Sequence, residues 1–516
     1  MSLVGRVGRR RWRARLAMAI LYILLAVGAV TTLYPFGIMV STGFKGATDQ
    51  NEAELVPKFW SDDALLLKKY VEDKYAGNLS LIDSTRIGGD ASADAVARYE
   101  AFLEALPNEL WTAGFRVAPS QVTGRLNMRY QAWLRDRYPN IDELNRAYIE
   151  ENVAFQTVAP PNELFERPTW KPNPGRKWDD WQAFKRTLPA EFRLPVRVER
   201  LWQEAVRGDA RNQFDQVPPE IKGTATKFEE IRWPDASATP KVRERLAEFR
   251  ANQLPASLRD RTVEDRWAEV APGPMPIAAT ESTWVARNAS DVRREFSGRN
   301  YRYVLDYILI NGRAVFNTAL FCLLAILTQL IVNPLAAYAL SRYPLKASGK
   351  ILLFLLATMA FPAEVAMIPS FLLLKDLGLL NTFAALVLPS AASGYMIFLL
   401  KGFFDSLPQE LYESGQLDGA KETTLMWRIA IPLSKPVLGY LALLAFMGAY
   451  GAFMYAFLVA QDQRMWTLMV WIYQLQLNAP KAVMMAALTL AAIPTLVVFL
   501  LCQRVIMRGI VLPGER

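Results

Sequence analysis

The residue types present in the sequence exclude several kinds of chemistry. There is no histidine, so the chain can form neither a Ser-His or Cys-His nucleophile pair nor a His-ligated metal centre. The two cysteines, Cys322 and Cys502, fall in long apolar runs, where a free thiol behaves as a small hydrophobic group. A G-x-x-x-x-G-K-[ST] phosphate loop is also absent, so any ATP chemistry must come from another chain. The sequence therefore predicts no catalytic site, no metal site and no cofactor bound by this chain.

Three polar side chains lie inside apolar runs, where they could contact a solute. A carboxylate such as Glu364 is costly at membrane depth, so it is expected to face a cavity or a partner. Gln329 and Asn333 are one helical turn apart, and such a pair serves helix packing as readily as solute binding. We assign these residues to a substrate path, with a structural role as the alternative for each.

The segment 406–436 carries a more specific pattern. Leu411, Gly415 and Asp418 recur at helical spacing, which predicts a short amphipathic helix along a membrane surface. Gly419 permits a bend, and a second helical piece is expected to stop at Pro432 and Pro436. An ordinary interhelical loop is the alternative interpretation.

The elements that position these residues are long uncharged runs, each near the roughly 20 residues that cross a bilayer. They predict six transmembrane helices, at 16–40, 314–340, 351–374, 382–400, 437–460 and 482–502. The first run is too long for a usual signal peptide and lacks a small-residue cleavage site, so we expect it to remain as an anchor.

Basic residues in the short connecting segments predict the orientation. They cluster before the first run, after the second, after the fourth and after the last. By the positive-inside rule, we expect both termini to be cytoplasmic. We expect the stretch of roughly 250 residues between the first two runs to be extracytoplasmic. This bias accounts for the net charge of +9, so no nucleic-acid partner is expected.

A resemblance gives the 406–436 segment a role. The spacing of residues in this segment resembles that of the EAA loop of bacterial ABC-importer permeases. Other segments of the chain resemble the carbohydrate branch of this family, particularly its maltose-type second permease. Ser414 and Gly415 depart from the two alanines usual in that family. The resemblance is carried by Glu413, Asp418, Gly419, Ala420, Ile429 and Pro432. It implies that these residues couple the chain to the ATPase.

The resemblance implies an inner-membrane transport subunit that imports a sugar or oligosaccharide. Its implied partners are a second permease in a heterodimer, two ABC ATPases that bind ATP and magnesium, and an extracytoplasmic solute-binding protein. A bulky residue at Gly419 is expected to uncouple ATP hydrolysis from uptake, because a Cβ would obstruct close packing there.

The stretch before the second apolar run contains a repeated pattern. Residues 99–110 match residues 181–192, with partial copies at 130–135 and 246–250, and each full copy ends near a Leu-Pro pair. These copies predict helical hairpins, and Asn140 with Glu143 predicts a capped helix start. The segment is expected to be a docking surface for the receptor or for partner subunits.

The predicted fold is thus all-α, an importer permease of six transmembrane helices with a large helical insertion between the first two. The expected divisions of the chain are a basic cytoplasmic N-terminus at 1–15, a first transmembrane helix at 16–44, an insertion at 45–300, a permease core at 301–511 and a cytoplasmic C-terminus at 512–516. Two alternatives remain, an anchored extracellular recognition or enzyme module and an ion-coupled carrier. Six spans exceed what an anchor needs, and a carrier predicts inverted repeats that the sequence does not show convincingly.

Overall fold

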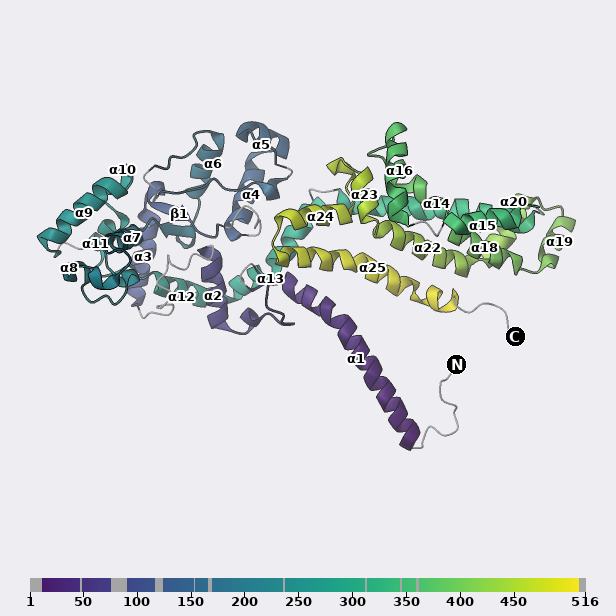
Figure 1. Ribbon diagram of the computed structural model, residues 1–516, viewed down its shortest axis with the longest axis horizontal. Coiled ribbons are helices and arrows are strands. Elements are labelled where there is room, and N and C mark those ends of the chain that lie inside the picture. The colour runs from purple at the N-terminus through teal and green to yellow at the C-terminus, as the bar shows by residue number, and fades with distance from the viewer. Residues whose placement is uncertain are drawn as a thin grey trace. The chain divides into compact units, whose positions relative to one another are not determined.

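The computed structural model describes residues 12–46, 49–75, 91–116, 124–152, 154–165, 169–234, 237–310, 313–343, 346–358 and 362–509. The chain divides into two compact units. Unit 1 comprises residues 1–303 with 478–483, and unit 2 comprises residues 304–477 with 484–516. Both are built almost wholly of helices (Figure 1), as the sequence predicts.

Unit 1 begins with the long helix α1 (Trp12–Gly43) and continues with short helices. Their bounds are α2 Asp63–Lys74, α3 Ala93–Ala105, α4 Arg125–Arg137, α5 Ile141–Tyr148, α6 Arg176–Lys185, α7 Glu199–Asp209, α8 Pro219–Lys222, α9 Pro240–Gln253, α10 Ala256–Arg259, α11 Val263–Val270, α12 Ile277–Arg287 and α13 Ala289–Leu305. The predicted capping of α5 is confirmed, since the Asn140 side chain accepts a hydrogen bond of 2.9 Å from the Glu143 amide.

The two full sequence copies fold alike. In each, a helix (α3 or α6) ends before a Leu-Pro pair, because proline cannot continue the helical hydrogen bonding. A 3₁₀ turn and a three-residue strand follow, β1 (Trp111–Ala113) in the first copy and β2 (Arg193–Pro195) in the second. The sequence did not predict these strands.

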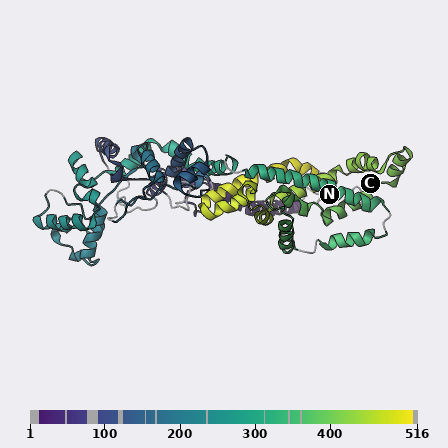
Figure 2. The ribbon, with the colours of Figure 1, turned by 90° about the horizontal axis from the view of Figure 1, so that it is seen from above.

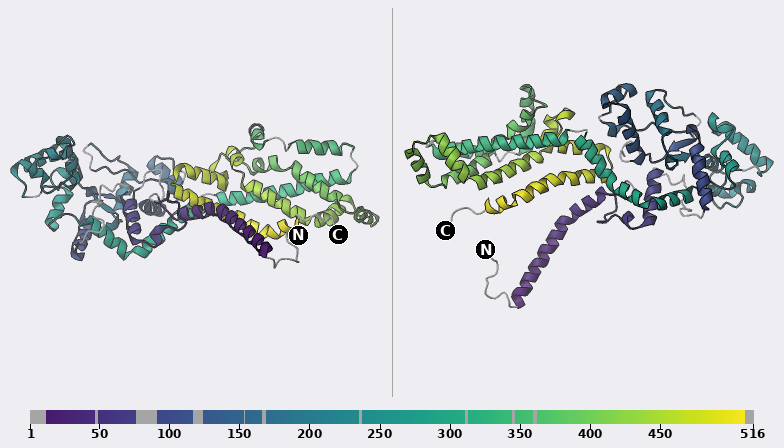
Figure 3. Two further views of the ribbon diagram at one scale, coloured as in Figure 1. Left: turned by 60° about the horizontal axis from the view of Figure 1, so that its bottom comes forward. Right: turned by 180° about the vertical axis from the view of Figure 1, so that it is seen from behind.

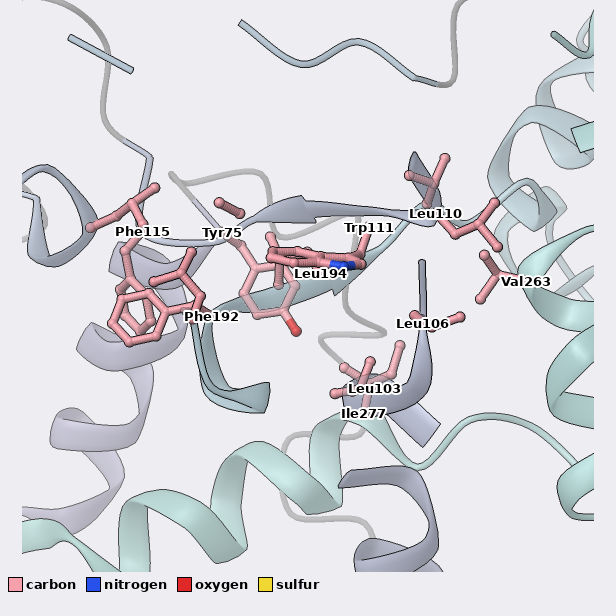
Figure 4. Close-up of a cluster of buried hydrophobic side chains, with 14 of the residues drawn as sticks. Tyr75, Leu103, Leu106, Leu110, Trp111, Phe115, Phe192, Leu194, Val263 and Ile277 are labelled. Atoms are coloured by element: carbon pink, nitrogen blue, oxygen red, sulfur yellow. The ribbon is translucent and has the colours of Figure 1, made fainter. Parts of the chain in front are cut away.

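The two copies meet through those strands. β1 and β2 pair antiparallel, with Thr112 opposite Leu194. These residues occupy equivalent positions in the two copies, and Trp111 pairs with the residue equivalent to Ala113. A local pseudo-two-fold axis therefore passes between Thr112 and Leu194. The copies bury each other's aromatic side chains, and Figure 4 shows Phe115 beside Phe192 and Trp111 beside Leu194.

A buried charge pair also ties the copies together. The Lys185 ammonium on α6 lies 2.7 Å from the Glu163 carboxylate, and both side chains are fully buried. Lys185 donates two further hydrogen bonds, to the carbonyls of Asn108 and Trp111 in the first copy. Burial lowers the pKa of Lys185 from its ordinary value. The Lys185 ammonium can stay buried because each of its three N–H donors has a hydrogen-bond acceptor.

The two ends of the stretch predicted to be an insertion, residues 45–300, lie together within unit 1. The Asn300 amide on α13 donates to the carbonyls of Gly43 and Lys45, at 2.9 and 2.6 Å. The Tyr301 hydroxyl donates to the Val40 carbonyl at 3.1 Å. The start of this stretch, at the end of α1, is therefore hydrogen-bonded to its end, on α13.

One carboxyl group of unit 1 leads to a pH prediction. Glu264 on α11 accepts the Val198 and Glu199 amides at the start of α7, at 2.8 and 3.0 Å, and burial raises its pKa to about 7. Between its ordinary pKa, about 4.3, and about 7, the folded state binds more protons than the unfolded state. Stability therefore falls as pH rises through this window and is flat above it.

We expect the first turn of α7 to lose about 1–2 kcal/mol of protection between pH 5 and pH 7.5. Hydrogen-exchange protection factors of the purified chain measure this. Glu264→Gln is the control, and an equal pH dependence in that variant would contradict the assignment.

Unit 2 holds the remaining helices. After a π-helical turn at Asp306–Ile310, their bounds are α14 Ala314–Arg342, α15 Ser348–Thr358, α16 Ala363–Asp376, α17 Phe383–Val387, α18 Gly394–Asp405, α19 Gln409–Leu417, α20 Glu422–Leu425, α21 Ile431–Leu433, α22 Lys435–Tyr450, α23 Phe453–Val459, α24 Leu468–Asn478 and α25 Lys481–Gly509. The long helix α14 lies against α18 and α22 (Figure 1 and Figure 2), and this contact forms the centre of the unit.

Within the described ranges, three helices are long and apolar enough to cross a membrane, at Met18–Gly43, Ala314–Arg342 and Lys481–Gln503. Two bent pairs, Phe383–Ser390 with Gly394–Asp405 and Glu422–Leu433 with Lys435–Tyr450, raise this number to five.

The predicted single helix at 351–374 is wrong. The run is divided between α15 and α16, and Pro362 is the N-cap residue of α16. A proline has no amide hydrogen to continue a preceding helix, so it favours a new start. The predicted run 437–460 is likewise divided, since α22 ends at Tyr450 and α23 begins at Phe453.

Candidate functional site

The 406–436 segment forms two helical pieces at one end of unit 2. α19 lies at the extreme end of this unit in both views of Figure 3. The second piece runs without a break through α20, a π-helical turn at Met426–Ala430 and α21. An 80° bend then separates it from α22.

Pro432 does not stop the second helix, contrary to the prediction. It lies inside α21, and the preceding π-helical turn explains how this is possible. The Ile431 amide bonds to the Met426 carbonyl, so the helix has already left α-helical spacing before the proline. The chain turns only after Leu433, and Pro436 falls in the first turn of α22, where its missing amide hydrogen costs nothing.

α19 ends in a Schellman motif centred on Gly419. The Ala420 amide bonds to the Gly415 carbonyl and the Gly419 amide to the Gln416 carbonyl, both at 2.9 Å. Gly419 has φ +80°, a left-handed conformation that favours glycine. No atom of the described chain lies within 4 Å of a Cβ placed there, so the predicted packing conflict does not arise within this chain.

Two substitutions at Gly419 distinguish backbone strain from packing. Asparagine tolerates left-handed backbone whereas valine does not, so we expect Gly419→Asn to retain most uptake and Gly419→Val to lose about 1–2 kcal/mol of local stability. Hydrogen exchange of the 409–430 amides and solute uptake measure the two effects. Equal losses in both variants would instead indicate that a partner chain packs against this position.

The close approach predicted for Gly419 occurs at Gly415. A Cβ on Gly415 would lie 2.6 Å from Leu425 Cδ2 and 3.3 Å from Ile429 Cδ1. The α19 backbone therefore rests directly on the side chains of the second helical piece. This is the position at which the sequence departs from alanine, and the departure permits the contact.

Side chains at the C-terminal end of α14 fasten α19 to α14. Tyr412 is completely buried, and the Arg342 guanidinium lies 3.7 Å from the centre of its ring. The Tyr338 hydroxyl donates to Glu422 at 2.9 Å, and the Gln416 amide donates to the other oxygen of that carboxylate at 3.3 Å. Glu422 thus connects α14, α19 and α20.

These fastening residues were not predicted from the sequence. Leu411, which was named for its helical spacing, is 39% exposed, and its neighbour Tyr412 is the buried residue. An aromatic residue three positions before a glycine on a short helix was the available signal, since positions i and i+3 share a face.

The predicted site residues differ in burial. Glu413, Asp418, Gly419 and Pro432 are exposed, whereas Ala420 and Ile429 are half-buried and pack on the cluster that contains Tyr412. Glu413 accepts a hydrogen bond of 2.7 Å from Gln409. Leu417, not singled out from the sequence, is 89% exposed beside Asp418. The segment therefore has one side fastened to α14 and another open, with acidic and apolar groups on it.

The substrate-path residues are not brought together with this segment. Glu364 is exposed in the first turn of α16, and Gln329 is buried on α14. Asn333 is completely buried and fully used, because its amide donates to the Gln329 and Ala391 carbonyls and its oxygen accepts the Ser393 amide at 2.7 Å. This contact joins α14 to the break before α18, which is a helix-packing role.

The chain is similar to several known proteins. Residues 332–511 match the family described as "Binding-protein-dependent transport system inner membrane component". Protein LplC of Bacillus subtilis (strain 168) is 30% identical over 253 residues, which are 45% of this chain and 84% of LplC. The sn-glycerol-3-phosphate transport system permease protein UgpE of Rhizobium meliloti (strain 1021) is 30% identical over 249 residues, 47% of this chain and 85% of UgpE.

A solved structure of a bacterial ABC transporter involved in the import of the acidic polysaccharide alginate is 26% identical, covering 40% of this chain and 78% of that chain, with a TM-score of 0.36.

Proposed function

The chain belongs to the family of binding-protein-dependent transport inner-membrane components, and from this premise we propose that it is the permease subunit of an ATP-driven importer of a sugar or oligosaccharide. The family is that of ABC-importer permeases, and its EAA motif is typical of them. UgpE is named as an sn-glycerol-3-phosphate transport permease, and a further relative, YtcP of Bacillus subtilis (strain 168), is named as a polygalacturonan/rhamnogalacturonan transport permease, which supports a carbohydrate-related solute.

The observation that carries the proposal is the geometry of segment 406–436. One side of α19 is fastened to α14 through Tyr412 and Glu422, while Glu413, Leu417 and Asp418 stay exposed. A segment built in this way can receive a partner on its open side and pass the displacement to α14. The proposed partner is an ABC ATPase, whose closure on ATP moves α19 and thereby the membrane helices.

The proposed assembly places both termini and segment 406–436 in the cytoplasm and the insertion outside. Two permease subunits form the pore, two ATPases hydrolyse ATP, and a soluble receptor delivers the solute. The proposed role of the insertion is to receive that receptor or another subunit. Its two ends are joined through Asn300, which holds the end of α1 beside α13.

Purification of the tagged chain from its native host tests this function. We expect to recover a second permease and an ATPase, and ATP turnover stimulated by a sugar-loaded receptor. Recovery of the chain alone, with no effect of any receptor on ATP hydrolysis, would contradict the proposal and turn attention to the insertion as an independent module.

A further inference from the structure

Unit 2 contains a hollow between α23 and α24, far along the chain from segment 406–436. Its volume is about 320 Å³, and its lining residues are Phe457, Leu458, Ala460, Gln461, Trp466 and Gln474. The Phe457 ring contacts Tyr473 of α24 at 5.2 Å between centroids, which holds the two helices together beside the hollow. The volume lies at the lower end of the range for small-molecule sites, about 300–1,000 Å³.

The loop that forms one wall is fixed by side chains of other elements. The Asn317 amide on α14 donates to the carbonyls of Arg464 and Trp466, at 2.8 and 3.0 Å. The Thr318 hydroxyl accepts the Leu468 amide at 2.8 Å. Asn381 accepts the Asp462 amide at 2.7 Å on the other side of the loop. The wall is therefore held in place without a ligand, which lowers the cost of binding one.

The chemistry of the lining selects a class of ligand. Gln461 and Gln474 are the polar members, and no lining side chain is charged. In the part of unit 2 that the structure describes, neither glutamine amide has a hydrogen-bond partner within the chain. Each amide offers two donors and an acceptor, which suits hydroxyl groups. Trp466 and Phe457 supply apolar rings.

We propose that this hollow is a solute-contact site for one sugar ring, with Gln461 and Gln474 bonding its hydroxyls and Trp466 and Phe457 covering its C–H face. The assignment rests on the proposed transport function and adds contact residues to it. They differ from the residues expected from the sequence, since Asn333 is fully used in packing.

The position of the hollow agrees with this role. Asn317, which holds its wall, and Arg342, which contacts Tyr412, lie on one helix 25 residues apart, or about 38 Å at 1.5 Å per residue. The hollow is thus at the end of α14 opposite to segment 406–436. In the proposed orientation that end faces outside, where the receptor delivers solute.

The test uses the complete assembly of both permeases, ATPase and receptor in proteoliposomes, with radiolabelled maltose, cellobiose, xylobiose and digalacturonate as probes. For the sugar that the wild type takes up, we expect Gln461→Leu and Gln474→Leu each to reduce kcat/KM about three- to tenfold, the usual effect of losing one neutral hydrogen bond. Gln476→Leu is the matched control for Gln474→Leu, because Gln476 is exposed on the same helix, α24, and does not line the hollow.

A second measurement does not depend on transport rate. In a Cys322→Ser/Cys502→Ser background, maleimide labelling of Gln461→Cys and Gln474→Cys should slow in the presence of the transported sugar, and labelling of Gln476→Cys should not. If the wild type takes up a probe while the hollow variants behave like the Gln476 variants, the contact site is wrong and the transport function stands. If the wild type takes up no probe and no probe changes labelling, both are rejected.

Discussion

Replacing Gly415 by leucine is expected to lower uptake about 10- to 100-fold while the chain still inserts in the membrane. A Cβ at this position would already lie 2.6 Å from Leu425 Cδ2, so a full leucine side chain must push α19 off the second helical piece. Overpacking of this kind costs about 1–3 kcal/mol. The displaced helix could no longer hold Tyr412 under Arg342, and the link from α19 to α14 would be lost.

Uptake and ATP hydrolysis in the same proteoliposomes measure this effect. Gly415→Ala should be much milder, since Leu425 Cδ2 is the free end of a flexible side chain and can give way. Gly402→Leu is the control, because no atom of the described chain lies within 4 Å of a Cβ at Gly402 on α18. Normal uptake by Gly415→Leu would show that close packing of the two helical pieces is not required for transport.

The sequence predicts the helical class and the place of segment 406–436 because both depend on local pattern. Long apolar runs identify α14 and α25, and the glycine and proline spacing identifies the turn after α19. The sequence does not predict the break at Pro362, because a proline inside an apolar run is equally compatible with a kinked membrane helix.

The contact of α14 with Glu422 on α20 is the second feature that could not be predicted. Tyr338 and Glu422 are distant in sequence, and nothing in the local pattern of either residue indicates the other. Their hydrogen bond follows from the packing of α14 on α18 and α22, which brings the end of α14 to α20. The strands β1 and β2 could not be predicted either, because they are too short to be recognised from the sequence alone. They form because the two repeat copies face one another.

The largest effect on assembly is expected from Leu417→Glu. Leu417 is 89% exposed at the end of α19, beside the left-handed turn at Gly419, and its side chain is not needed for the fold of this chain. If the ATPase covers this position, a carboxylate there would be buried without a partner, at a cost of several kcal/mol. We expect the ATPase to be lost on purification and uptake to fall to background, about 100-fold or more.

Ile149→Glu is the matched control for that variant. Ile149 is 93% exposed, an equally unprotected aliphatic residue, but it lies in the insertion of unit 1. Both substitutions add one negative charge and remove one exposed apolar side chain, so a general effect on solubility or net charge would appear in both. Loss of the ATPase in Leu417→Glu alone would assign the open side of α19 to that subunit, whereas full retention in both would move the docking surface away from segment 406–436.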